Sequence, residues 1–359
     1  MDEDEWISKY LLPKRILRQF EDFSAGEDQT LPALVKMLAQ FSIEWFPEYF
    51  KKTYGIDIEF DESRTREFKT HLENYLGKIL EAVKRVSELP EGGVCEAMEF
   101  LGKPFLELVT QNPNYRNNKY ESLFDFYDDF YKRILFAEFG DTYLSKTKIK
   151  AYREAIYQLI DRMLSLSGGR VFLSSLLDSH EFSSDMFFMQ KLWFGLITEI
   201  DYLDGKFKRL SAPTVYKLAE LYYKLSEVYS KFVIVVRILV EFAEGNTNVN
   251  LQTEYNKHSL NNHVEKIRKS SDYYDLGNID TVMRNALSHR TYQYDSGQKS
   301  IIFKDRRHSV TLKPKDLLEK TRELSSLVFA LLNMLNYVQY RRLTMIRDYC
   351  LQRKLNSTN

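Results

Sequence analysis

Apolar residues recur at three- and four-residue spacing along most of this chain, and such spacing is typical of amphipathic helices. Short breaks such as Asn112-Pro113-Asn114 and Ser167-Gly168-Gly169 separate the periodic segments, and no longer repeat recurs. In the first part of the chain the pattern predicts helices over residues 7–20, 31–54, 63–87, 94–110, 120–139, 145–166 and 186–202.

A polar, turn-rich segment from Asp201 to Pro213 interrupts this series of helices. Ser211 and Pro213 at its end are typical of a helix start, with Ser at the cap and Pro in the first turn. We therefore predict two domains. Residues 1–205 form a helical N-terminal domain with a sensing, regulatory or dimerising role, and residues 206–359 form a second domain.

The second domain combines helices with short strands. Helices are predicted from Pro213 to Gly245, with Gly245 as the C-terminal cap, then over 251–270 and 279–289, and finally from Pro314 to at least Tyr337. Alternating apolar and polar residues predict strands at 291–294, 300–304 and 309–312, joined by turns at 295–297 and 305–307. We expect an all-α fold whose C-terminal domain is a four-helix bundle with a short β excursion.

Composition supports long helices and argues against a membrane span. The chain has 24 Tyr and 24 Phe but only 14 Gly and 8 Pro, which is unlike a turn-dense β fold. Its most apolar run, residues 232–240, contains Arg237 and is about half as long as a membrane span. Cys95 and Cys350 indicate no disulfide framework, and the acidic N-terminus does not resemble a signal peptide. We therefore expect a cytoplasmic protein.

Charge is distributed unevenly along the chain, although the net charge is zero. Residues 281–359 hold 15 Lys and Arg against 6 Asp and Glu, whereas residues 1–280 hold 36 against 45. This asymmetry favours a basic C-terminal surface that binds a polyanion. A solvated helix face followed by a basic tail is the other interpretation.

The run Arg284-Asn285-Ala286-Leu287-Ser288-His289 is the most informative stretch of the second domain. At about 100° per residue, a helix places its polar and apolar side chains on opposite arcs. The polar arc presents a cation, an amide, hydroxyls and an imidazole, and the apolar arc is expected to pack against the core. The polar arc holds Thr281, Arg284, Asn285, Ser288 and His289, and the apolar arc holds Ile279, Val282, Met283, Ala286 and Leu287.

This Arg-Asn-x-x-x-His run resembles the signature of HEPN-domain ribonucleases. The flanks also resemble that family, because Asn278-Ile279-Asp280 opens the motif helix, a β excursion follows the His, and a long amphipathic helix begins at Pro314. The resemblance covers the C-terminal part of the chain only. It implies a HEPN-like bundle, and a homodimer in which two motifs share one cleft. Proteins of this kind often act as toxins or abortive-infection effectors in prokaryotes, which implies an antitoxin or trigger protein as a partner.

The side chains suit metal-independent cleavage of RNA by its own 2′-hydroxyl. That reaction needs a base, an acid and positive charge near the phosphorane. His289 can transfer protons near neutral pH, Arg284 offers a planar donor fork to phosphate, and Asn285 can bind the phosphate or hold the imidazole. No metal or cofactor is needed. One helix offers one His for two proton transfers, so we expect a homodimer. Substrate contacts are expected from Ser288, Arg290 and Tyr292.

Several other residues have two interpretations. Arg66 and His71 repeat the motif spacing, but Glu67 would repel a phosphate and the stretch is typical of a charged helix face. His308, with Arg306 and Arg307, can contact RNA or form a polar turn. Tyr292 and Tyr294 can stack on bases or pack across strands. Asp125, Asp128 and Asp129 suggest a cation site or the wet side of an aromatic helix.

The competing function is a non-catalytic, HEPN-like helical module that binds RNA or a partner protein through the same basic face. The intact motif favours the enzyme, because a pure binding module has no need for His289.

Overall fold

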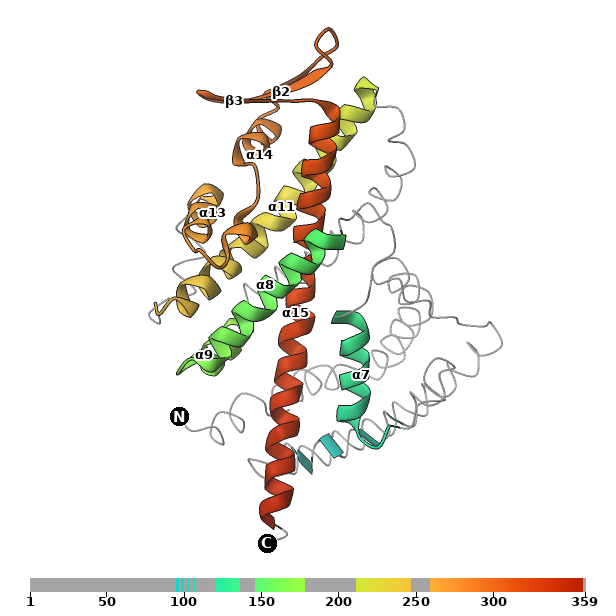
Figure 1. Ribbon diagram of the computed structural model, residues 1–359, viewed down its shortest axis with the longest axis vertical. Helices are drawn as coiled ribbons and strands as arrows, with labels where there is room; N and C mark the ends of the chain where they lie inside the picture. Colours follow the sequence, from blue (N-terminus) through green and yellow to red (C-terminus); the bar gives the residue numbers. More distant parts are fainter. Residues whose placement is uncertain are drawn as a thin grey trace, which may run out of the picture. The chain divides into compact units, whose positions relative to one another are not determined.

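The computed structural model describes residues 120–135, 146–177, 211–246 and 259–357, with a few residues between 95 and 106. Within these residues the protein is mainly helical and has a three-stranded sheet (Figure 1), which confirms the predicted helical class. None of the described helices is both long and apolar enough to cross a membrane. The helices predicted over 7–20, 31–54, 63–87 and 186–202, and the domain boundary predicted at residues 205/206, lie outside the described residues.

The chain divides into two compact units. One is formed by Phe139–Leu335 and contains the Arg-to-His motif. The other is formed by Met1–Glu138 with Asn336–Asn359. Helices α8 (Lys146–Ser165) and α9 (Gly169–Leu177) precede the predicted boundary in the sequence but belong to the same unit as the motif. The sequence pattern did not predict α9.

Helix α11 (Ala212–Ala243) is the core of the motif-bearing unit, and apolar residues are buried along its length. It begins after the cap Ser211 with Pro in its first turn, as predicted. At its other end Gly245 adopts φ of 100°, its N–H bonds to Phe242, and the N–H of Asn246 bonds to Glu241. This is a Schellman cap, which requires a left-handed residue and so favours glycine. The helix predicted from Pro213 to Gly245 is confirmed.

Helices α8, α13 (Leu260–Arg268) and α14 (Thr281–Ser288) pack on α11. Two fully buried tyrosines of α11 hold the segment that leads into α14. The Tyr229 hydroxyl donates to the Leu276 carbonyl at 2.7 Å, and the Tyr222 hydroxyl accepts from the Asp280 N–H at 3.0 Å. Burial raises the pKa of both phenols, so they stay protonated at any physiological pH.

The sheet is an antiparallel meander of β1 (Tyr292–Asp295), β2 (Ser300–Asp305) and β3 (His308–Leu312). All three strands were predicted, and their ends differ from the prediction by one residue. Ile301 and Phe303 of β2 are fully buried, and β2 packs on α14. Helix α15 (Pro314–Ser357) follows β3 directly and contributes residues to both units. Because β2 and β3 both contact α14, the hairpin that they form lies beside the motif helix.

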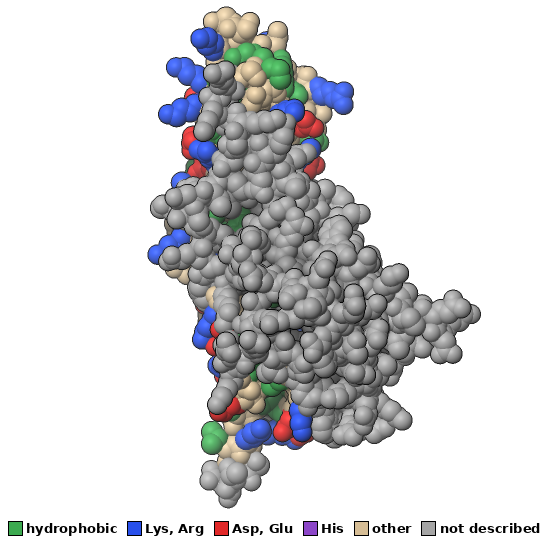
Figure 2. Space-filling view, turned by 90° about the vertical axis from the view of Figure 1, so that its right-hand side faces the viewer, with side chains coloured by type: hydrophobic (Ala, Val, Ile, Leu, Met, Phe, Trp, Pro, Cys, Tyr) green, Lys and Arg blue, Asp and Glu red, His purple; other side chains and the backbone are tan. Residues whose placement is uncertain are grey.

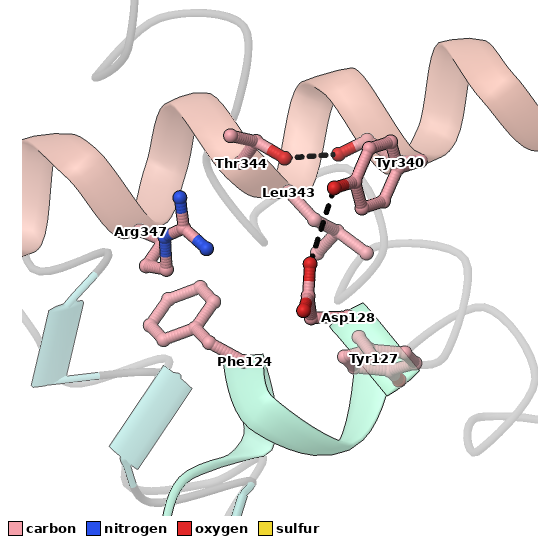
Figure 3. A pocket seen from close by; sticks show the side chains of 7 residues that line it. All are labelled: Phe124, Tyr127, Asp128, Tyr340, Leu343, Thr344 and Arg347. Carbon is pink, nitrogen blue, oxygen red and sulfur yellow. Dashed lines mark hydrogen bonds between the residues drawn. The ribbon is translucent and has the colours of Figure 1, made fainter. Parts of the chain in front are cut away.

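In the other unit, α7 (Leu123–Leu135) packs against the last part of α15. Asp128 accepts a hydrogen bond from the Tyr340 hydroxyl at 3.1 Å, beside a small pocket that Phe124 and Arg347 also line (Figure 3). Asp125 caps the helix start through Ser122, and Asp129 accepts from Tyr120 at 2.5 Å. These separate partners support the interpretation of α7 as an aromatic helix with a wet side. The carboxylates do not converge on one point.

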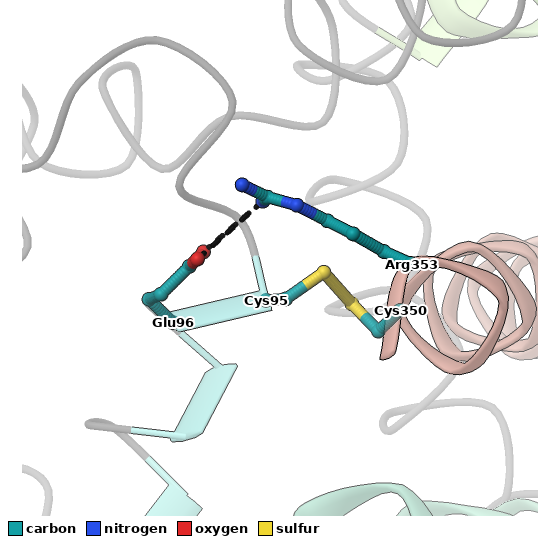
Figure 4. Close-up of a disulfide and its surroundings, with 4 residues drawn as sticks. All are labelled: Cys95, Glu96, Cys350 and Arg353. Carbon is teal, nitrogen blue, oxygen red and sulfur yellow. Dashed lines mark hydrogen bonds and ion pairs between the residues drawn. A yellow bond between two sulfur atoms is a disulfide. The ribbon is translucent and has the colours of Figure 1, made fainter. Parts of the chain in front are cut away.

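A disulfide joins Cys95 to Cys350 in α15, with the two Cα atoms 5.5 Å apart (Figure 4). Beside it Arg353 forms an ion pair with Glu96 at 3.4 Å. The sequence indicated no disulfide framework and did not predict this single bond, because 255 positions separate the two cysteines and sequence spacing gives no sign of their approach. The two cysteines therefore give no support to a reducing compartment.

The partly buried carboxylate of Glu241 in α11 is bound by cations from two helices. The Arg237 side chain is fully buried and donates to Glu241 at 2.8 Å, and Lys266 of α13 binds the other oxygen of Glu241 at 2.9 Å. Partial burial opposes ionisation of Glu241, but the bonds from Lys266 and Arg237 hold its pKa below the ordinary value. A carboxylate with a depressed pKa stabilises the fold above its unfolded pKa, and this contribution is lost as the pH falls through the folded pKa.

We expect Glu241→Gln to lower the free energy of unfolding by about 1.5–3 kcal/mol at pH 7, because charge-assisted bonds to a buried cation are lost. Urea titration followed by circular dichroism measures this change. Glu154→Gln is the matched control, since Glu154 pairs with Lys150 at 3.9 Å in an exposed i, i+4 arrangement and should contribute less than about 0.5 kcal/mol. The deficit of Glu241→Gln should shrink below about pH 4.5, and a deficit independent of pH would contradict the assignment.

Candidate active site

The motif helix α14 presents its two faces as predicted. Asp280 caps its start, where its carboxylate accepts from the Met283 N–H at 3.1 Å. Met283, Ala286 and Leu287 are buried, whereas Arg284 and Asn285 are half-buried and His289 is exposed at the C-terminal cap.

A Schellman cap at the end of α14 fixes His289 beside the sheet. The N–H of Thr291 bonds to the Ala286 carbonyl at 2.8 Å, and that of Arg290 bonds to Leu287 at 3.2 Å. Arg290 occupies the left-handed position with φ of 57°, where most helices place glycine. A side chain in this conformation costs on the order of 1 kcal/mol. The Thr291 carbonyl also accepts from the Lys304 N–H at 2.9 Å, and the Thr291 hydroxyl donates to the Lys304 carbonyl, which ties the turn to β2.

Arg284 and Asn285 lie in a chain of hydrogen bonds that ends in a carboxylate on each side. Glu227 of α11 accepts from Arg284 Nε at 3.1 Å and from Nη2 at 2.9 Å. Arg284 Nη1 donates to Asn285 Oδ1 at 3.3 Å, and Asn285 Nδ2 donates to Asp305 Oδ2 at 2.8 Å. The side chains of Arg284 and Glu227 are 25% and 37% exposed, so water and ligands reach this pair.

The polar arc of α14 faces a cleft of about 850 Å³. Its walls come from α13, from α14 and from the turn between β2 and β3. The motif residues Arg284, Asn285 and His289 line it together with a second histidine, His308. The other described lining residues are Ser259, Leu260, Asn261, Glu265, Thr281, Val282, Asp305, Arg306 and Arg307.

Cations dominate the rim of this cleft on the sheet side. Arg306, Arg307 and His308 are exposed, and no hydrogen bond or ion pair joins their side chains to another described residue. Arg306 has φ of 52°, a second left-handed position that an arginine occupies in place of glycine. Lys and Arg side chains also project from the sheet end of the molecule on another side, which Figure 2 shows at the top of the view. These cations suit an anionic ligand, although the carboxylates of Glu265 and Asp305 also line the cleft.

None of the three predicted substrate contacts, Ser288, Arg290 and Tyr292, lines the cleft. Ser288 and Arg290 are exposed and adjacent to His289 in the sequence, but their side chains do not line the cleft. Tyr292 stacks on Phe303 across the strands, with ring centroids 6.1 Å apart, and approaches Tyr216 at 6.0 Å. Cross-strand packing thus accounts for Tyr292. Arg306, Arg307 and His308 lie at the polar turn between β2 and β3, as one interpretation had it. They also line the cleft, where contact with RNA, the other interpretation, is possible.

Sequence reasoning missed the acidic members of this site. Glu227 lies 57 residues before Arg284 on a helix that otherwise looks like a core element, and no local pattern marks it. Asp305 was assigned only to a turn, although its place at the end of a predicted strand could have directed attention to it. The second motif spacing, Arg66 to His71, lies outside the described residues.

Comparison of the chain with protein families, with characterised proteins and with solved structures gives no match. A function is therefore inferred from the cleft itself.

Because Glu227 neutralises Arg284, an anion entering the cleft must compete with it. Glu227→Gln should remove a repulsion worth on the order of 1 kcal/mol and tighten binding of a single-stranded DNA oligonucleotide about fivefold at low salt. Fluorescence anisotropy with a labelled oligonucleotide measures the dissociation constant.

Glu220→Gln is the control for net charge. Glu220 lies on the same helix, is 63% exposed and pairs with Lys224 at 3.7 Å instead of with the motif. It should tighten binding less than twofold. Equal effects from both variants would show that Arg284 has no special part in binding the anion.

Proposed function

We propose that this protein is a metal-independent endoribonuclease that cleaves RNA through attack of the 2′-hydroxyl, and that it acts as a toxin or antiviral-defence effector. The observation that carries the proposal is the convergence of His289, Arg284 and Asn285 on one cleft whose rim is cationic. The Arg-Asn-x-x-x-His resemblance to HEPN ribonucleases supports the same reaction.

Each motif residue has a role that its position supports. His289 is exposed at the cleft and has no hydrogen-bond partner among the described residues, so its imidazole is open to a substrate hydroxyl. Arg284 can exchange Glu227 for a phosphate oxygen, which places fixed positive charge where the phosphorane develops. Asn285 is held by Asp305 and orients the Arg284 guanidinium through its carbonyl oxygen.

The HEPN-like bundle, the homodimer, the cytoplasmic location and an antitoxin or trigger partner remain predictions from the sequence. The alternative function, a non-catalytic module that binds RNA or a protein, would use the same cationic rim. It gives no reason for an open imidazole in the cleft, and we therefore favour the enzyme.

Replacing His289 separates the two functions. If its imidazole transfers a proton, His289→Ala should slow RNA cleavage by a factor on the order of 10²–10⁴ while the circular dichroism spectrum stays the same. Chelator should leave the wild-type rate unchanged, and the products should carry 2′,3′-cyclic phosphate and 5′-hydroxyl ends. Cleavage rates and end-group analysis by mass spectrometry check both points.

His71→Ala is the control, because it changes the other Arg-to-His spacing and should leave cleavage unchanged. Wild-type activity in His289→Ala would remove the catalytic assignment. Products with 5′-phosphate ends would point instead to a metal-activated water. Binding without cleavage by the wild-type protein would favour the non-catalytic module.

Arg306 and Lys299 are cations in left-handed backbone conformations at the turns of the sheet, and only Arg306 lines the cleft. Replacing each of them separates the effect on stability from the effect on RNA binding. Arg306→Gly should relieve left-handed strain and raise the free energy of unfolding by about 0.5–1 kcal/mol, after allowing for the greater freedom of glycine in the unfolded chain. It should also remove one phosphate contact. The slope of log affinity against log salt for a 2′-O-methyl oligonucleotide should then fall in magnitude by about 0.7.

Lys299→Gly is the matched variant, since Lys299 is a cation with φ of 48° that does not line the cleft. It should gain the same stability and keep the wild-type salt slope. If both variants reduce the magnitude of the salt slope equally, the cleft is not where RNA binds.

A further inference from the structure

The cleft contains two imidazoles from a single chain. His289 ends the motif helix and His308 begins β3, 19 positions later, and both line the same hollow. A homodimer was expected because the reaction needs two proton transfers and each motif helix offers only one histidine. The structure supplies a second imidazole from the same unit.

The hydrogen bonds of the hairpin determine where His308 lies. His308 is the cross-strand partner of Asp305, and such partners have Cα atoms about 4.5–5.5 Å apart. Asp305 in turn accepts from Asn285 of the motif at 2.8 Å. Asp305 therefore contacts the motif helix and also lies opposite His308 in the hairpin. The turn between Asp305 and His308 carries Arg306 and Arg307 into the cleft.

We propose that His308 is the second proton-transfer group, so that one chain holds a complete site for RNA cleavage. This inference rests on the proposed ribonuclease function. One imidazole, which is neutral at the start, takes the proton from the 2′-hydroxyl while the 2′-oxygen attacks phosphorus. The bond from phosphorus to the 5′-oxygen then breaks, and that oxygen takes a proton from the other imidazole. The products are a 2′,3′-cyclic phosphate and a 5′-hydroxyl, and the two imidazoles have exchanged protonation states.

The charges around the two imidazoles suit a dianionic phosphorane. Arg284, Arg306 and Arg307 face the cleft, while Glu265 and Asp305 line the same walls. Asp305 and His308 flank the cationic turn, and Asp305 accepts a hydrogen bond from Asn285. Because histidine changes charge near neutral pH, it suits both transfers better than these carboxylates do.

The test compares His308→Ala and His308→Gln with His289→Ala. Each should slow cleavage by a factor on the order of 10²–10⁴ with little change in KM, and the double variant should lose little more than either single one. The wild-type pH profile of kcat/KM should be bell-shaped, and each single variant should lose one limb. Ser309→Ala is the control, since Ser309 is the next, exposed strand residue and does not line the cleft.

A substrate with sulfur in place of the scissile 5′-oxygen identifies the acid, because a thiolate leaves without a proton. This substrate should restore the rate of one of the two histidine variants and not of the other. Restoration of neither would overturn the assignment. A rise in KM with kcat unchanged in His308→Ala would do the same, since it would show that His308 only binds RNA.

Mixing His289→Ala chains with His308→Ala chains tests whether one chain holds both groups. The mixture should stay inactive, and wild-type activity should persist in the monomer measured by sedimentation. Restored activity would show that the two imidazoles come from different chains. Absence of cleavage by the wild-type protein would overturn the proposed function and this inference together, whereas unimpaired His308→Ala beside active wild-type protein would overturn only the inference.

Discussion

The hydrogen bond from Asn285 to Asp305 is the constraint on which the cleft depends. A small meander of short strands has little stability of its own and needs a partner surface. Burial of Ile301 and Phe303 against α14 supplies the attraction and, together with the tight turn between β2 and β3, favours one register. The hydrogen bond from Asn285 to Asp305 adds a polar contact between the motif helix and the sheet in that register. A slip of one residue would turn Asp305 and its cross-strand partner His308 to the other face of the sheet.

The same part of the molecule retains conformations and charges that do not favour stability. The left-handed positions at Arg290 and Arg306 hold arginines although glycine would fit each turn better. Strained residues of this kind cluster at functional sites when their side chains are needed there. Glu227 acts in the opposite sense, because it neutralises Arg284 in the absence of a ligand and stabilises the folded chain. The cleft is therefore a compromise between a stable free state and affinity for an anion.

Local patterns in the sequence predicted the elements of this unit well, because their causes are local. The proline in the first turn of α11, the glycine cap at 245 and the alternation in the strands all act within a few residues. Contacts between distant residues were not predictable. Nothing near Arg284 in the sequence points to Glu227, and nothing near Cys95 points to Cys350. The two faces of α14 followed from helix geometry, whereas the carboxylates that bind Arg284 and Asn285 required the packing of α11 and β2 against α14.

The prediction of a dimer shows how such a gap affects a functional argument. Counting imidazoles on one helix gives one per chain, and two proton transfers then require two chains. The count changes when every element that borders the cleft is included. Once the hairpin docks on α14, its turn brings a second histidine and two arginines to the motif. If His308 completes the site within one chain, as we propose, separating subunits cannot switch the site off. Control would instead have to act on access to the cleft or on the release of Arg284 from Glu227, and that contact links the site directly to α11, the core helix of the unit.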